Sequence, residues 1–177
     1  MAVEPGIFVS SVAMPYVVLQ QVSSAFAKSN ARRTIDKPVL LKYLKQFVPD
    51  DSYAELSKHY PEGWLYAWGA KLERQHQIEK MIPNRSLVLF RRARRVFRIG
   101  VITDLLVSIP LAEYLWGHDA DGETWAILYL MHKVRDVSFD VSDINKLIGR
   151  KELDNWQGMT SVGGKAASDV IAYVKQR

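Results

Sequence analysis

The chain has 177 residues, of which 48% are hydrophobic and 24% are charged, as in an ordinary globular domain. This composition excludes a disordered or collagen-like chain. Because the chain contains no cysteine, disulfides, iron–sulfur clusters and cysteine-ligated zinc sites are excluded as well. Its 24 Lys and Arg exceed its 19 Asp and Glu, for a net charge of +5.

The excess positive charge belongs to one segment. The stretch 85–98 holds six arginines and no acidic residue, whereas the rest of the chain holds 18 bases and 19 acids. The six are Arg85, Arg91, Arg92, Arg94, Arg95 and Arg98. A local cluster of this kind is typical of a phosphate-binding surface. No apolar run approaches the ~18 residues of a membrane-spanning helix and no signal peptide is evident, so we expect a cytoplasmic protein without membrane contact.

The N-terminal third is predicted to be helical. Val18, Val22 and Phe26 lie four residues apart, which predicts a helix over 16–27, and the polar stretch 29–33 is expected to be a loop. A second helix is expected to begin near Pro38, and a third to follow the turn at 49–52. We therefore expect residues 1–62 to form a helical N-terminal addition.

The middle of the chain changes to a strand pattern. A β-favouring aromatic run covers 64–68, and the strongest strand predictions are 86–90 and 96–106, with the arginine cluster at the turn between them. A helix is expected over 72–82 and another over 110–116. The stretch 117–122 is a predicted turn, and it precedes a strand over 123–131 with 134–139 as a candidate continuation.

The last part returns to helices. Asp140 or Ser142 is expected to cap a helix that ends near Gly149, residues 156–158 form a predicted loop, and 165–175 form an amphipathic terminal helix. The fold class is therefore α+β, with a curved, barrel-like mixed β-sheet flanked by helices. We expect one domain over 1–177, with 63–162 as its core and 163–177 as a C-terminal helix.

Catalytic and metal motifs are absent from the sequence. The four histidines have no metal-ligand spacing, and the acidic turn after His118 does not complete a calcium loop. Gly158 to Lys165 only approximates a phosphate loop, and no acidic residue or glutamine has the lysine two positions later that many metal-dependent nucleases need. No serine lies in a Gly-x-Ser-x-Gly elbow. We expect a binding domain without catalytic activity and without a cofactor.

The arginine cluster allows a structural and a functional interpretation. In the structural one, Arg91-Arg92-Ala93-Arg94-Arg95 is a solvated hairpin tip or a sheet edge protected by charge. In the functional one, the cluster binds phosphates. Mixed charges would serve solubility equally well, however, and the guanidinium fork matches phosphate oxygens. This favours nucleic acid as the partner.

The tryptophans also allow two interpretations. Taken singly, each is expected to be partly buried in the core, and Trp125 is interpreted as core. Taken together, tryptophans near loop ends beside an arginine hairpin indicate a base-stacking pocket next to a backbone-binding surface.

The middle of the chain resembles a known family. The segments that carry the resemblance are the strand with Trp64 and Trp68, the strand Ser86–Phe90, the Gly100-Val101 strand, Trp116 and the strand around Trp125. Their succession resembles the PUA-like superfamily, and within it the YTH and EVE domains that bind modified bases. The helical addition and the phrase Trp68-Gly69-Ala70-Lys71 are similar to the N-terminal DNA-binding domains of archaeal McrB-type restriction proteins.

The resemblance implies a function and a site. A methylated base would be flipped out of double-stranded DNA into an aromatic cage, with N6-methyladenine as the first choice and 5-methylcytosine as the second. The implied cage residues are Trp64 or Trp68 and Trp116. A third wall would be Tyr66, Tyr114 or an aliphatic side chain, unless the cage is incomplete, and the six arginines would bind phosphates. A GTPase motor domain on the same polypeptide and a separate nuclease subunit are implied as partners.

Three alternatives remain open at this level. PUA-like folds also bind RNA, and nothing in the sequence reads the 2′-hydroxyl. The arginine hairpin could instead contact an acidic protein, and a hydrolase without a recognisable motif is the third alternative.

Overall fold

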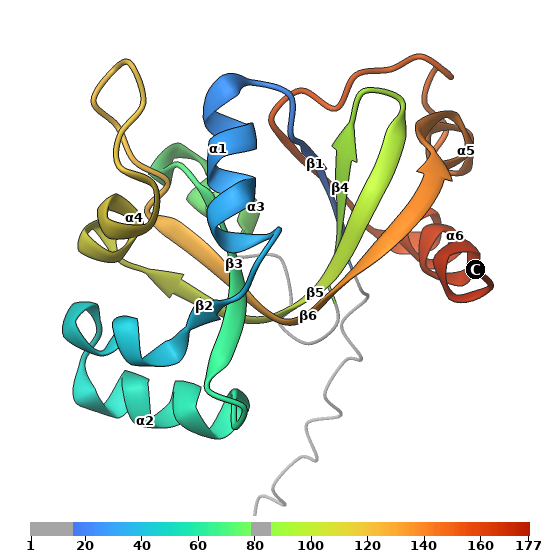
Figure 1. Ribbon diagram of the computed structural model, residues 1–177. Helices are drawn as coiled ribbons and strands as arrows, with labels where there is room; N and C mark the ends of the chain where they lie inside the picture. The colour runs from blue at the N-terminus through green and yellow to red at the C-terminus, as the bar shows by residue number, and fades with distance from the viewer. Residues whose placement is uncertain (1–15, 79–85) are drawn as a thin grey trace, which may run out of the picture.

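One mixed β-sheet of seven strands forms the centre of the protein. The computed structural model describes residues 16–78 and 86–177 (Figure 1). The strand order is β2–β3–β6–β5–β4–β1–β7. The strands are β1 (Val17–Gln21), β2 (Val39–Leu40), β3 (Trp64–Ala70), β4 (Leu87–Arg92), β5 (Arg95–Val107), β6 (Ile127–Asp140) and β7 (Met159–Val162). Strands β1 and β4 pair in parallel and the other described pairs are antiparallel.

Helices cover both faces of this sheet (Figure 1). They are α1 (Ala25–Thr34), α2 (Asp50–His59), α3 (Gln75–Ile78), α4 (Ile109–Trp116), α5 (Val141–Leu147) and α6 (Gly164–Lys175). The 3-10 turns are η1 (Leu41–Tyr43), η2 (Lys45–Phe47) and η3 (Leu72–Arg74). In the described part of the chain, none of the helices is long and apolar enough to cross a membrane.

The alternation of side chains along the strands divides the core into two faces. Val18, Trp68 and Tyr129 point to the face covered by α1. On the opposite face, Val17 and Leu19 pack under α5 and α6. Further along that face, residues of β3 and β6 pack under α2 and α4. The α+β class with a helix-flanked mixed sheet is thus confirmed.

Strands β5 and β6 give the sheet its curvature. Their pairing shifts register between Val96 and Arg98, between Gly100 and Ile102, and between Ile102 and Asp104. Such irregularities increase the local twist and bend a strand. The sheet is curved but open, because β2 and β7 lie at opposite ends of the strand order.

The N-terminal prediction is partly wrong. Val17–Gln21 is a strand between β4 and β7, not part of a helix over 16–27, and the expected loop at 29–33 lies within α1. Val17, Val18 and Leu19 are completely buried, because helices cover both faces of the sheet there, so β-branched residues with a helix-compatible spacing form an inner strand. Residues 16–62 therefore contribute β1 and β2 to the sheet as well as helices.

Most later elements are confirmed. The strands β3, β4, β5 and β6 and the helices α2, α4, α5 and α6 lie where the patterns predict them, whereas β7 is missed and Trp125 precedes β6 instead of lying in it. The expected helix over 72–82 is described only to Ile78, as η3 and α3. Ala93 turns the β4–β5 hairpin with a φ of 52°, in the left-handed region.

Candidate nucleic-acid interface

Three tryptophans from separate parts of the chain line one pocket. Trp68 comes from the end of β3, Trp116 from the last residue of α4, and Trp125 from the loop before β6. The pocket has a volume of about 180 Å³. Its other lining residues are Gln20, Gln21, Ser24, Ala27, Asn30, Gly69 and Gly158. We call this site the tryptophan pocket.

Gly69 allows the three indoles to come together. A Cβ atom at Gly69 would lie 2.5 Å from Cζ3 of Trp116 and 2.7 Å from Cβ of Trp125. Real Cβ atoms do not approach other atoms so closely, so any side chain here would displace a wall. The dipeptide Trp68-Gly69 thus supplies one wall of the pocket, and the missing side chain of Gly69 leaves the space that Trp116 and Trp125 occupy.

The pocket also contains polar groups that the protein does not satisfy. The Nε1–H of Trp68 is buried and donates to no acceptor in the described part of the chain. Asn30 is buried in the pocket wall, and its carboxamide makes no hydrogen bond to any described residue. Buried polar groups normally have partners, since leaving one unpaired costs about 1–3 kcal/mol. A donor and a carboxamide without partners are therefore suited to a ligand with its own donors and acceptors.

Other polar groups of the pocket hold its walls in place. The Tyr129 hydroxyl donates to Oε1 of Gln20 at 3.0 Å, and Trp116 Nε1 donates to Oγ1 of Thr34 at 3.2 Å. Burial raises the pKa of the Tyr129 hydroxyl, which keeps it protonated as a donor. The walls contributed by β1 and α4 are thereby fixed to β6 and α1.

The predicted cage residues divide into two groups. Trp68 and Trp116 line the tryptophan pocket, as the cage prediction requires. Trp64 and Tyr66 lie toward the other end of β3, where the Trp64 ring contacts those of Tyr66 and His132 with centroid distances of 5.8 and 6.2 Å. Tyr114 does not line the pocket, and its ring contacts that of Phe47 with a centroid distance of 4.7 Å.

Trp64, Tyr66 and Tyr114 do not line this pocket, so the structure does not bring them together with Trp68 and Trp116 there. Four residues along a strand separate two side chains by roughly 13 Å, although both lie on one face. Trp64 and Trp68 share a face but cannot share a base.

Two of the predicted phosphate ligands have structural roles. Arg91 is buried, and its guanidinium lies over the Trp156 ring at 5.5 Å. It donates hydrogen bonds to the carbonyl of Ala93 and to the carbonyl of Asp154, the latter at 3.1 Å. Arg98 donates to Asp36 and Asp136 at 2.7 and 2.8 Å. Neither guanidinium is available as a simple phosphate contact, because each is already occupied by carbonyls or carboxylates.

The remaining described arginines of the cluster point outward from the β4–β5 hairpin. Arg92, Arg94 and Arg95 are exposed. Arg92 lies over the Phe97 ring at 4.5 Å and Arg95 donates to Ser138, whereas the Arg94 guanidinium makes no hydrogen bond or ion pair with a described residue. Arg85 lies outside the described residues. The hairpin thus presents three cations to solvent.

The hairpin and the tryptophan pocket lie at the same edge of the sheet. The amide of Val22, directly after β1, donates to the Arg91 carbonyl at 2.9 Å, and Gln20 of β1 lines the pocket. Arg91 also holds the loop before β7, whose Gly158 is another pocket residue. In Figure 1 the β4–β5 turn and the N-terminal end of α1 lie along one edge, together with the loops on either side. A phosphate backbone held by the hairpin would therefore pass close to the pocket.

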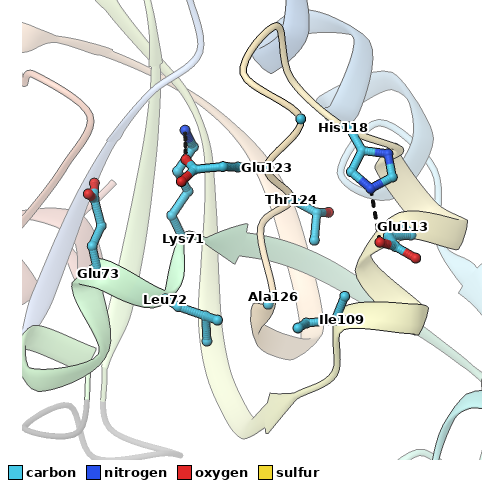
Figure 2. A pocket seen from close by; sticks show the side chains of 10 residues that line it. Lys71, Leu72, Glu73, Ile109, Glu113, His118, Glu123, Thr124 and Ala126 are labelled. Atoms are coloured by element: carbon cyan, nitrogen blue, oxygen red, sulfur yellow. Dashed lines mark hydrogen bonds and ion pairs between the residues drawn. The ribbon is translucent and has the colours of Figure 1, made fainter.

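A second hollow is lined in part by Glu123, Thr124 and Ala126, the neighbours of Trp125 in its loop (Figure 2). It has a volume of about 260 Å³, and Glu73, Glu113 and Glu123 contribute to its lining. Lys71 is held there between Asp119 and Glu123, each at 2.6 Å. The carboxylates disfavour a phosphodiester, so this hollow is not the nucleic-acid site. Its ion pairs instead tie the 117–125 loop to the end of β3.

Sequence reasoning missed part of the site. Trp125 was interpreted as core, and neither Asn30 nor Gln20 was singled out. In the described part of the chain, no group of His, Cys, Asp and Glu is arranged to hold a metal ion. The carboxamides of Asn30 and Gln20 near three tryptophans carry no sequence signal, since β1, α1 and β3 come together only in the fold.

The fold and the site together define a class. An open, curved mixed sheet with helices on both faces is consistent with the PUA/YTH-like fold expected from the sequence, and the aromatic pocket lies at the edge of this sheet. No protein-family profile and no curated protein sequence matches the chain.

One solved structure matches the fold closely. It is the N-terminal domain of Thermococcus gammatolerans McrB bound to m5C DNA, with a TM-score of 0.68 and 18% sequence identity. The match covers 90% of this chain and 97% of that one. The resemblance to McrB-type N-terminal domains is thus confirmed at the level of the fold.

Proposed function

We propose that this chain is a DNA-binding domain without catalytic activity that binds a methylated base flipped into the tryptophan pocket. The observation that carries the proposal is the pocket itself, whose lining combines three tryptophans, the unpaired Nε1–H of Trp68, and Asn30, whose carboxamide makes no hydrogen bond to a described residue. The indoles can stack on a base, while Trp68 donates to a ring nitrogen or carbonyl of the base and Asn30 pairs with its edge.

The energies are of the right size for base flipping. Extruding a base from a duplex costs a few kcal/mol, and stacking on an aromatic side chain returns roughly 1–3 kcal/mol per base. Burying one methyl group adds on the order of 1 kcal/mol. A methyl group therefore changes affinity by several-fold, which is a preference rather than an absolute requirement.

The exposed hairpin supplies the sequence-independent part of binding. Arg92, Arg94 and Arg95 are free to approach phosphates flanking the flipped nucleotide, and such contacts make affinity depend on salt. Arg91 and Arg98 act indirectly, because they hold the hairpin and its neighbouring loop in position.

N6-methyladenine remains our first candidate for the base, because the sequence pattern is more similar to YTH than to EVE domains. 5-Methylcytosine is the second, and the solved McrB domain bound to m5C DNA supports it. By the same resemblance we propose a targeting role in a modification-dependent restriction system, with a motor domain on the same polypeptide and a separate nuclease subunit.

Trp125→Ala tests the pocket more sharply than a change at Trp116. Trp125 is only partly buried, whereas Trp116 also serves the core through its bond to Thr34. We expect Trp125→Ala to weaken binding of a methylated duplex about tenfold and to abolish its preference over the unmethylated duplex. Trp64→Ala, at the other end of β3, should leave that preference intact.

The titration needs four probes at two salt concentrations. They are duplexes with N6-methyladenine, with 5-methylcytosine and with no modification, and a matching RNA. Equal binding of the three duplexes by the wild-type chain would overturn methyl recognition while leaving the basic hairpin as a DNA contact. Tighter binding of RNA would replace DNA as the ligand.

A further inference from the structure

Phe26 is an exposed aromatic residue beside the tryptophan pocket. It lies in the first turn of α1, with 45% of its surface exposed. Its ring contacts Trp125, with the centroids 6.3 Å apart and the planes at 48°. Its neighbours Ser24 and Ala27 line the pocket, so Phe26 stands at the pocket's margin.

The packing of α1 does not require this phenylalanine. The helix contacts the sheet through Ala31, Thr34 and the following Ile35, all completely buried. Ser24 caps the helix by accepting a hydrogen bond from the Ala27 amide at 3.0 Å, which fixes the direction of the first turn. An exposed ring on a well-anchored turn costs hydrophobic free energy that burial in a ligand would recover.

The charge of α1 suits an approach to DNA. Its ten residues contain no acid, and Lys28, Arg32 and Arg33 are exposed along it. The helix can therefore approach a phosphodiester backbone without repulsion, and it brings Phe26 with it.

We propose that Phe26 enters the DNA duplex at the position vacated by the flipped base. This inference rests on the proposed function, because a gap exists only if a base leaves the stack. An empty position in a duplex loses the stacking of the bases above and below it, and an inserted apolar side chain restores part of that contact. Phe26 is the large apolar side chain that contacts a pocket wall while its own surface faces solvent.

The experiment compares duplex with single-stranded DNA that carries the same methylated base. A single strand has no gap to fill, so only the duplex should depend on Phe26. We expect Phe26→Ala to weaken duplex binding about tenfold and single-strand binding by less than about twofold. Phe26→Trp should retain duplex binding, and thermal unfolding of each variant checks that α1 is intact.

Leu153→Ala is the matched control. Leu153 is 71% exposed and lies near Arg91 and Arg94, away from the tryptophan pocket. It should leave both affinities unchanged. If Leu153→Ala causes the duplex-specific loss and Phe26→Ala does not, the proposal is wrong and the wedge is Leu153.

Two other outcomes also contradict the proposal. An equal loss on duplex and single strand would make Phe26 a support for Trp125, and no loss on either would remove it from the interface. The methyl preference of the wild-type chain tests the proposed function, whereas the duplex-to-single-strand ratio of Phe26→Ala tests the wedge. Each can therefore fail without the other.

Discussion

The two ends of β3 carry the same kind of side chain and do different things. At one end, Trp64 packs edge-on against Tyr66 and His132, and the imidazole of His132 lies 3.2 Å from a carboxylate oxygen of Glu62. At the other end, Trp68 faces a pocket with its Nε1–H unpaired. The two ends differ in the segments that pack beside them, since only the Trp68 end meets α1, the end of α4 and the 117–125 loop.

The arginine run shows the same contrast over shorter distances. Arg91 faces inward and binds backbone carbonyls, whereas Arg94, three residues later, is exposed and its guanidinium makes no hydrogen bond to a described residue. A cluster of one residue type is thus divided by the fold into a part that builds the site and a part that is free to contact a ligand.

The largest expected effect breaks the contrast between the two tryptophans of β3. Trp68→Ala should lower the free energy of unfolding by about 3–5 kcal/mol, because it opens a cavity beside Phe90 in the core. Trp64→Ala should cost only about 1 kcal/mol, because that ring is partly solvated. Urea unfolding measures both values, and equal losses would show that the two ends are equivalent in packing.

The second effect concerns the arginine run. Arg91→Ala should lower the free energy of unfolding by about 2–3 kcal/mol, since it removes the guanidinium donors from the Ala93 carbonyl and leaves the Asp154 carbonyl with Asn145 as its side-chain donor. Arg91→Lys should not restore the free energy of unfolding, because the ammonium group of lysine lacks the planar fork with which a guanidinium reaches both carbonyls.

Arg94→Ala is the matched change on the surface. It should alter stability by less than about 0.5 kcal/mol but reduce the slope of log affinity against log salt by about 1. A stable Arg91→Ala chain with a reduced salt slope would mean that Arg91 contacts phosphate after all.

The sequence predicts the elements better than it predicts their neighbours. The hairpin of β4 and β5 follows from two apolar runs around a charged turn, and α4 follows from Pro110 and an apolar helical stretch. Val17–Gln21 was predicted wrongly, because Val18 and Val22 also suit a helix, whereas the pairing of this segment with β4 and β7 and the cover of both its faces by helices exist only in the fold.

The site was predicted in part for the same reason. Trp68 and Trp116 followed from a family pattern, and the pocket contains both. Trp125 was assigned to the core because alternation places it in a strand, whereas β6 begins only at Ile127. The sequence does not indicate Asn30 as a site residue, because its capacity to bind a base depends on its carboxamide having no partner in the folded chain.

The third effect separates folding from binding at Trp68. Trp68→Phe retains an aromatic ring but removes the unpaired Nε1–H, so the loss of packing is offset by removal of a buried, unsatisfied donor. Stability should change by less than about 1 kcal/mol, while affinity for the methylated duplex should fall about tenfold. Calorimetric titration together with urea unfolding gives both quantities. Unchanged affinity would show that Trp68 contributes only a ring face.

The smallest effect concerns the loop that brings Trp125 to the pocket end of β3. The pKa of the Asp119 carboxyl is lowered, chiefly by its hydrogen bond from Lys71 and also by backbone amides of Glu123 and Asp121. Because the folded protein favours the charged form, this contribution is present at neutral pH and is lost as the pH falls below about 4 through the lowered pKa. Amide hydrogen exchange over 119–125 should accelerate there, relative to the intrinsic rate, before the rest of the protein opens.

At neutral pH, Asp119→Ala should weaken methylated DNA binding only about threefold, as expected for a partly solvated ion pair. Asp119→Asn retains an acceptor for the two amides and should weaken it less, and equal losses for both variants would assign the effect to charge alone.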